Sequence, residues 1–305
     1  MSVLLNGTQA AHKIFGDAVE YEERRTISGM VTSGHLLKHR LTRSSDTLRA
    51  VQETVQIGVV PQENTIFGNV IETYDGLRRS QCGFVKGEIT LQIQHCLLAK
   101  RGVRLQEIET VLSHEQALGQ CQDFLDANLP NASRVKTPST ASAARALLAG
   151  SRTCAAICSK VCATIFDELE IIREGIQKEA DNFTRFYIIV RDREVEFPTA
   201  APHTANCRAL IRLWISPPPP SGTRPHKDVI HYLASSGLGI TRIDRRPSDD
   251  DLPFRDVYFV EVAGTAEVMG RSEQSPAIRS WPMSVADALG FIRNMGGEVD
   301  LIGLW

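Results

Sequence analysis

The sequence lacks the long hydrophobic run that a membrane protein needs. Its apolar stretches all fall short of the ~20 residues required to span a bilayer, so we expect no transmembrane helix and no membrane partner. The stretch MSVLLNGTQAAHKIFG (1–16) has no charged region ahead of its short apolar patch, which makes it a poor secretory signal. We therefore expect a cytoplasmic protein.

An excess of positive charge is also missing. Lys and Arg total 34 against 36 Asp and Glu, for a formal net charge of −2. Binding to a phosphate backbone requires a basic field, so nucleic acid is not an expected partner. With 42% hydrophobic and 23% charged residues, the 305-residue chain has the composition of a soluble globular protein and the length for two domains.

A disulfide framework is absent as well, because seven cysteines are an odd number and lack dense spacing. Cys154, Cys158 and Cys162 recur every four residues and would share one face of a helix, where we interpret them as reduced core thiols. His35 and His39 are also four apart, but no cysteine or carboxylate accompanies them. The sequence therefore predicts no metal site.

Short apolar strands alternate with helical segments through residues 1–193, a pattern typical of an α/β domain. The predicted strands are 55–61, 89–100, 108–114 and 185–190, the predicted helices are 115–128 and 141–150, and 155–160 leads from a strand into a helix. Two prolines and no sustained period mark a linker near 193–206.

Residues 207–305 predict a second, smaller domain with the order strand, helix, strand, strand, helix, strand. The segments are 207–216, 226–237, 238–244, 256–264, 284–297 and 299–305. This is the ferredoxin-like βαββαβ arrangement, which suits a regulatory or pairing domain. Two segments look added: the polyproline stretch 216–222, a stiff surface loop or an SH3-type ligand, and the basic excursion 29–45.

Five motifs, in order along the chain, resemble those of the prephenate dehydratase family. They are GVVPQENTIFGNVIETYD (58–75), LSHEQALGQC (112–121), TPSTASAARAL (137–147), NFTRFYII (182–189) and LGITRIDRRP (238–247) followed by VYFVEVAG (257–264). The last pair resembles the ESRP region of an ACT domain, closest to the fungal branch. The resemblance implies two catalytic α/β lobes like type 2 periplasmic binding proteins, with the site in the cleft between them, followed by an ACT domain.

The reaction that the resemblance implies converts prephenate to phenylpyruvate with loss of carbon dioxide and water. The ring carboxylate supplies the electrons, so the difficulty lies in expelling hydroxide. The catalyst must donate a proton or strong hydrogen bond to the departing oxygen and hold the ring so that both bonds break together. Neither a metal nor an organic cofactor is required.

Catalytic roles follow from matching positions. Thr184 matches the family's catalytic threonine, and Arg185 beside it can pair with a carboxylate, such as one of the substrate's. Asn64 contacts substrate by resemblance, and Glu63 orients it or acts as a proton source. A carboxylate facing a dianion needs a compensating partner. Read alone, these residues are ordinary strand-mouth and turn residues.

Further substrate contacts are implied at three other places. Ser113 and Gln120 match polar positions of the second motif, whereas His114 is interpreted as a structural hydrogen-bonding residue. Ser139 and Thr140 begin a helix, where hydroxyls and free N–H groups suit a carboxylate as well as an ordinary cap. The family's opening loop corresponds to LNGTQAAHKIFG (5–16), which keeps Thr8 although the strand before it is nearly absent.

In the second domain, Asp244, Arg245, Arg246 and Pro247 match the ESRP region and imply an L-phenylalanine effector. The family's GAL[VY] motif is not recognisable, and residues 225–228 take its place. Domains of this kind commonly pair, so a homodimer or homotetramer is expected.

Three other functions remain open. Arogenate dehydratase differs only by an amine in place of the keto group of the substrate. A non-aromatising prephenate decarboxylase keeps the hydroxyl, and the intact TRF triplet at 184–186 disfavours it. A catalytically impaired, ligand-binding homologue is the third.

Overall fold

The computed structural model describes most of the chain. The described residues are 2–5, 10, 20–22, 44–53, 55–79, 82–196, 207–215, 229–234, 238–250, 252–264 and 280–305. Four features discussed above lie outside them: Thr8, most of the basic segment 29–45, the polyproline segment 216–222 and residues 225–228.

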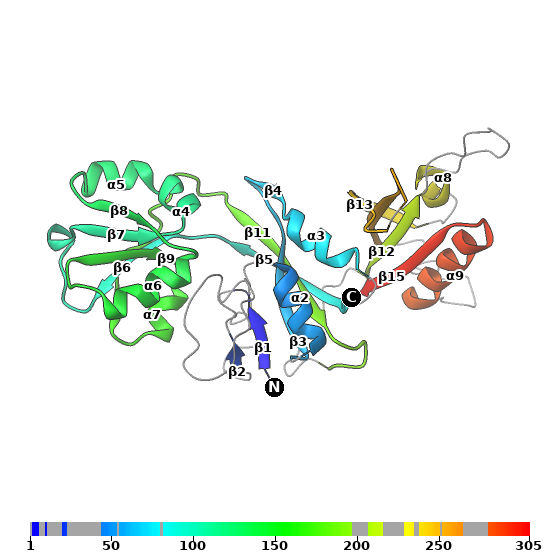
Figure 1. Cartoon of the computed structure of the whole chain (residues 1–305), viewed down its shortest axis with the longest axis horizontal. Coiled ribbons are helices and arrows are strands. Elements are labelled where there is room, and N and C mark those ends of the chain that lie inside the picture. Colours follow the sequence, from blue (N-terminus) through cyan, green and yellow to red (C-terminus); the bar gives the residue numbers. More distant parts are fainter. Residues whose placement is uncertain are drawn as a thin grey trace, which may run out of the picture.

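The described elements fall into three groups along the long axis of the molecule (Figure 1). The first lobe, in the middle, comprises β1 (Ser2–Leu5), β2 (Glu20–Glu22), α2 (Ser44–Glu53), β3 (Ile57–Asn64), β4 (Gly68–Asn69), α3 (Ile71–Leu77), β5 (Phe84–Gln92) and β11 (Phe183–Val190). The second lobe comprises β6 (Cys96–Lys100), η2 (Leu105–Glu107), β7 (Thr110–Ser113), α4 (Glu115–Gln120), α5 (Gln122–Asn128), β8 (Ser133–Lys136), α6 (Thr140–Ala149), β9 (Cys154–Cys158), α7 (Val161–Ile165) and β10 (Leu169–Arg173).

The C-terminal unit follows the predicted βαββαβ order in the part of the chain that the structure describes. It comprises β12 (Arg208–Ile215), α8 (Val229–Ala234), β13 (Gly239–Pro247), β14 (Asp256–Ala263), α9 (Trp281–Asn294) and β15 (Glu298–Leu304). This confirms the predicted sequence of strands and helices, and the α/β class of the whole chain.

Two mixed sheets organise the described residues. The first lobe and the C-terminal unit share one, in the order β13-β14-β12-β15-β5-β11-β3-β1-β2, with β4 beside β3. The second lobe has its own, in the order β10-β6-β9-β7-β8. The chain crosses from one sheet to the other twice, between β5 and β6 and again between β10 and β11.

The run 186–190 forms the best-buried part of β11. All five residues are buried, and β11 lies between β5 and β3, antiparallel to both. A strand with a neighbour on each edge and a packed layer on each face needs no polar alternation, which explains the continuous apolar run. The polar residues that precede this run therefore lie at the mouth of a central strand.

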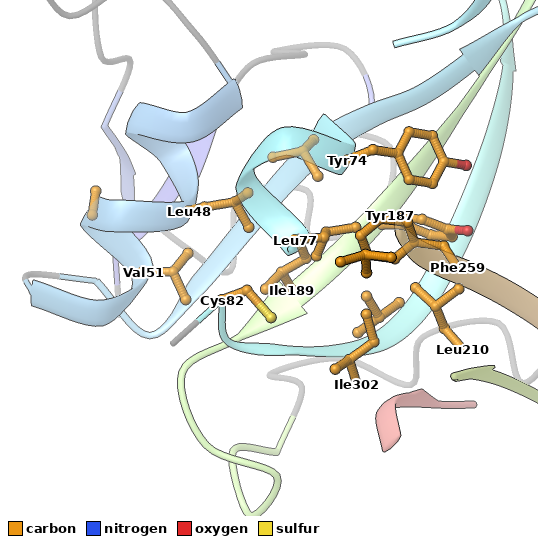
Figure 2. Packing of buried hydrophobic residues seen from close by; sticks show 14 of the residues in the cluster. Leu48, Val51, Tyr74, Leu77, Cys82, Tyr187, Ile189, Leu210, Phe259 and Ile302 are labelled. Atoms are coloured by element: carbon orange, nitrogen blue, oxygen red, sulfur yellow. The ribbon is translucent and has the colours of Figure 1, made fainter. Parts of the chain in front are cut away.

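One hydrophobic cluster joins the first lobe to the C-terminal unit (Figure 2). From the first lobe it contains Leu48, Val51, Tyr74, Leu77, Tyr187 and Ile189, and from the C-terminal unit Leu210, Phe259 and Ile302. The ring centroids of Tyr74 and Phe259 lie 5.2 Å apart. Since each such buried side chain stabilises the fold by ~1.5–3 kcal/mol, the two parts stabilise one another.

The sheet of the C-terminal unit is packed on both faces. Ala209, Ile211 and Leu213 of β12 share a core with α8 and α9. The alternate residues face the first lobe: Leu210 joins the shared cluster, and Arg212 donates to the Leu77 carbonyl oxygen at 2.9 Å. Because successive side chains of a strand point to opposite faces, β12 contributes side chains to two different cores.

The single strand expected over 89–100 is wrong. β5 ends at Gln92, and β6 begins at Cys96 in the other sheet. At the crossing, Ile93 N–H donates to the Asn182 carbonyl oxygen at 2.7 Å, which ties the outgoing segment to the returning one. The alternating pattern of β5 runs on past Gln92, and apolar residues continue through β6. The sequence pattern therefore did not show where one sheet gives way to the next.

The helix expected for the three regularly spaced cysteines is also wrong. Cys154 and Cys158 belong to strand β9, and only Cys162 lies in a helix, α7. A spacing of four returns to the same face of a strand as well as of a helix, so the spacing was ambiguous. All the cysteines are free thiols, buried or half-buried.

Two smaller expectations also change. Ser2–Leu5 forms a strand parallel to β3, so the first strand is present rather than nearly absent. The predicted helix 115–128 is divided at Cys121, which ends α4 and precedes α5.

The contact between β15 and β5 depends on the absence of a side chain at Gly303. A Cβ there would lie 2.7 Å from the Val85 Cβ and 3.1 Å from the Val85 carbonyl oxygen, in the register pair that joins the two strands. We predict that Gly303→Ala lowers the free energy of unfolding by ~1–3 kcal/mol. Gly290→Ala in α9 is the control, because nothing lies within 4 Å of its added Cβ. Equal denaturation midpoints for the two variants would contradict the prediction.

Candidate active site

The ends of β3 and β11 bring four of the predicted residues together. The antiparallel register pairs Thr184 with Asn64 and Arg185 with Glu63. A register shift follows between Arg185 and Phe186, where the buried part of the strand begins. Although 120 positions separate them in sequence, the side chains of Asn64 and Thr184 are hydrogen-bonded.

Asn64 fixes the environment of the Thr184 hydroxyl. Its Nδ2 donates to Thr184 Oγ1 at 2.9 Å and to Asn182 Oδ1 at 2.6 Å. Its Oδ1 accepts from the backbone N–H groups of Ile66 and Phe67 at 2.9 and 3.1 Å, which holds the amide against the following turn. Thr184 is only 8% exposed, and because its oxygen accepts from Asn64, the hydroxyl keeps its proton to donate.

Arg185 is surrounded by protein carboxylates. Its guanidinium lies 3.3 Å from Glu63, 3.6 Å from Glu261 and 3.9 Å from Glu88. Arg208 of β12 also pairs with Glu261, and its Nε lies 3.5 Å from Glu88. Burial raises the pKa of the Glu88 carboxyl, and the nearby Arg208 opposes that rise. The contacts of Arg185 are with the protein itself, so its binding to substrate remains a prediction.

The C-terminal unit reaches the same place through Arg242. Its guanidinium donates to Glu63 and Asn69 of the first lobe and to Asp244 of its own strand. Asp244 in turn accepts from Asn69 and, at 2.7 Å, from the Tyr74 hydroxyl. Burial raises the pKa of this tyrosine, so it stays a neutral donor. Arg242 lies inside the fifth motif, but the resemblance implied no role for it.

Three of the four predicted effector residues contact the first lobe. Asp244 does so as described, Arg246 Nε pairs with Asp75 at 2.8 Å, and the Pro247 carbonyl oxygen accepts from Arg78 at 3.0 Å. Arg245 points the other way, where its side chain is 61% exposed and pairs with Asp256. The alternation along β13 therefore decides which side chains meet the lobe, whereas Pro247 meets it through its backbone.

The predicted residues of the second lobe make local hydrogen bonds. Ser113 is fully buried and donates to the Ile157 carbonyl oxygen at 2.7 Å, which ties β7 to β9. Ser139 caps α6 by accepting from Ser142 N–H at 3.0 Å, and Thr140 is the first residue of that helix. His114 caps α4, as expected of a structural hydrogen-bonding residue.

Gln120 contacts the crossing between the lobes. Its Oε1 lies 2.7 Å from Nε2 of His95, which occupies the segment between β5 and β6 and is only 7% exposed. The His95 backbone N–H donates to Gln177 at 2.9 Å, and its carbonyl oxygen accepts from Ile176 at 3.0 Å. The outgoing segment, which contains His95, is thus hydrogen-bonded to the returning segment, which contains Ile176 and Gln177.

No group of three or more potential metal-binding side chains occurs among the residues that the structure describes. Nor is any helix in the described ranges both long and apolar enough to cross a membrane.

Burial lowers the pKa of His95, so the unfolded chain binds its proton more readily than the folded chain does. The stability that this histidine contributes is complete above its unfolded pKa of about 6.5 and is lost as the pH falls below that value. We predict that the unfolding free energy of the wild type falls relative to that of His95→Gln on acidification from about pH 7.5 to about pH 5.5. The slopes of unfolding free energy against pH for the two proteins differ by at most ~1.4 kcal/mol per pH unit. Parallel pH profiles would contradict it.

A family model and several known proteins are similar in sequence to this chain. The family model described as prephenate dehydratase matches residues 7–194. A bifunctional chorismate mutase/prephenate dehydratase of Neisseria gonorrhoeae is 31% identical over 258 residues, covering 84% of this chain and 63% of that protein. Arogenate dehydratase 3 of Arabidopsis thaliana, a chloroplastic protein, is 34% identical over 217 residues, covering 68% and 46% respectively.

The fold has a counterpart among solved structures. The structure of prephenate dehydratase in complex with L-Phe from Arthrobacter aurescens matches with a TM-score of 0.70 at 22% identity, covering 100% of this chain and 89% of that one. The chain spans between about half and somewhat under two thirds of the curated relatives named above. The family match over more than half of its length shows that the chain belongs to the prephenate dehydratase family.

Proposed function

We propose that the chain catalyses the decarboxylating dehydration of prephenate to phenylpyruvate. The observation that carries the proposal is the Thr184 hydroxyl, held by Asn64 at the mouth of two central strands beside the Arg185–Glu63 pair. Family membership supplies the substrate class.

In the reaction, the bond from the ring to its carboxylate breaks, and its electron pair enters the ring as carbon dioxide leaves. The carbon–oxygen bond on the opposite side breaks, and the oxygen departs with a proton from Thr184 as water. Prephenate is a dianion and phenylpyruvate a monoanion, so the reaction consumes one proton overall. Thr184 donates that proton and is then reprotonated from solvent. The gain of aromaticity drives both cleavages.

Asn64 compensates for the weak acidity of the hydroxyl. As Thr184 gives up its proton, negative charge grows on Oγ1, and the Asn64 amide already donates to that atom at 2.9 Å. A donor that is fixed before the reaction stabilises the charge without reorganisation. The five hydrogen bonds that Asn64 makes through its two amide atoms provide that fixation.

Electrostatic compensation prepares the site for a dianion. Glu63 alone would repel the substrate, but Arg185 and Arg242 both pair with it. The substrate therefore meets a neutralised carboxylate. This fits the expectation that Glu63 needs a compensating partner. Of the two roles expected for Glu63, we propose that it orients its neighbour Asn64 rather than that it supplies a proton.

Arogenate is the second candidate substrate, because a named arogenate dehydratase is among the relatives at 34% identity. It carries the same ring, carboxylate and hydroxyl, so the proposed chemistry at Thr184 applies unchanged. The two substrates differ only in a side chain that bears a keto group or an amine.

We propose residues 1–193 as the catalytic domain, with lobes like those of type 2 periplasmic binding proteins, and 207–305 as an ACT domain. The double crossing between two sheets and the βαββαβ order support these assignments. L-phenylalanine is the proposed effector at Asp244, Arg245, Arg246 and Pro247, since a protein of the same fold was solved with L-Phe bound. A cytoplasmic homodimer or homotetramer stays a prediction.

Thr184→Val keeps the shape of the side chain and removes its hydroxyl. We predict that kcat for prephenate falls ~100-fold or more, the contribution of a positioned proton donor, with little change in KM or melting temperature. Thr184→Ser, which keeps the donor, is the matched control and retains most of the activity. Phenylpyruvate is measured by its absorbance in alkali, and arogenate turnover by phenylalanine formation.

Other outcomes separate the alternatives. A product that keeps its hydroxyl would identify a decarboxylase. Binding of prephenate without turnover of either substrate would identify a ligand-binding homologue. Full activity of Thr184→Val would remove the hydroxyl from the mechanism.

A further inference from the structure

We propose that Arg242, on a strand of the C-terminal unit, is a positioning residue for the active site of the first lobe and acts through Glu63. The inference rests on the proposed function, since it concerns the site around Thr184. It assigns to the C-terminal unit a direct part in basal turnover, separate from any effector.

Arg242 holds both strands of the hairpin that carries Asn64. Glu63 and Asn69 are register partners in the β3–β4 pair, and the guanidinium of Arg242 donates to the side chains of both. A planar guanidinium presents several donors in a fixed fork, so one side chain can tie two acceptors together. The Arg242 side chain is only 15% exposed, which limits competition from water.

The position of this hairpin determines the position of the Asn64 amide. Asn64 is the last residue of β3, and its Oδ1 accepts from the N–H groups of Ile66 and Phe67 in the turn to β4. A shift of the hairpin would therefore move the donor that supports Thr184. Small displacements of a catalytic group are costly, on the order of 100-fold for about 1 Å.

Arg242 is itself anchored. Asp244, two residues along the same face of β13, pairs with the Arg242 Nε and accepts from the Tyr74 hydroxyl. Tyr74 is 2% exposed and packs against Phe259 of β14 in the shared core, as Figure 2 shows. The link from this core to the catalytic amide thus passes through Tyr74, Asp244, Arg242 and Glu63.

Arg255 supplies a matched control. Like Arg242, it is largely buried, at 12% exposure, and it pairs with two carboxylates. Those partners, Asp250 and Glu298, belong to the C-terminal unit, so the pairs do not reach the first lobe. Arg242→Met and Arg255→Met each remove a buried guanidinium of the same unit, but only the first removes contacts with Glu63 and Asn69 of the first lobe.

With the full chain, we predict that Arg242→Met lowers kcat roughly 10-fold with KM changed by less than about 3-fold, whereas Arg255→Met keeps the wild-type kcat. Arg242→Lys restores part of the loss, because an ammonium can still pair with Glu63. In a double-mutant cycle, Arg242→Met costs less in a Glu63→Met background than in the wild type, since one of the two side chains through which it holds the hairpin is already gone. Equal losses on both backgrounds, or an equal loss in Arg255→Met, would overturn the inference.

A second measurement is independent of turnover. Hydrogen–deuterium exchange of residues 63–70 should rise in Arg242→Met and stay at the wild-type level in Arg255→Met; unchanged exchange in Arg242→Met would overturn the inference. If the wild type converts neither prephenate nor arogenate, the proposed function fails, and the exchange result alone decides whether Arg242 positions the hairpin.

Discussion

Charge compensation at the ends of β3 and β11 is the interaction on which the rest of the structure depends. Glu261 is only 1% exposed, so water cannot solvate its carboxylate. The guanidinium of Arg185 lies 3.6 Å from that carboxylate. Buried charges are costly unless paired and hydrogen-bonded. The required partners come from the first lobe and from the C-terminal unit together. Arg185 belongs to the first lobe and Glu261 to the C-terminal unit, and Arg208 of the C-terminal unit lies 3.5 Å from Glu88 of the first lobe. The two parts thus share these charges, as they share one sheet and one hydrophobic cluster.

This shared burial gives the C-terminal sheet two functions. One face supports its own helices, and the other supports the strand ends of the candidate active site. Under the proposed effector role, a ligand that engages Asp244 or Arg246 has to compete with Asn69, Tyr74 and Asp75 for them. Binding at β13 and catalysis at Thr184 would then be linked energetically, because the same side chains take part in both.

Asn64 has three separate structural roles. Its backbone ends a central strand, its carbonyl oxygen atom Oδ1 fixes the next turn, and its Nδ2 donates to Thr184. Another amide or carboxylate side chain would fill only some of these roles: aspartate has no N–H to donate, and glutamine is one methylene longer. The proposed chemistry therefore depends on local backbone geometry as much as on the identity of the threonine.

The sequence by itself determined the α/β class, several of the buried strands and, after residue 206, the order of the elements. The β-branched and aromatic run 186–190 specified a buried strand, and the pattern of apolar segments after residue 206 specified βαββαβ. Only the tertiary structure decided which strand ends meet, where 89–100 divides between two sheets, and that Arg242 reaches Glu63. The physical reason is that periodicity is a local property of the chain. The partner of a buried charge or a strand edge is selected across more than a hundred residues by packing.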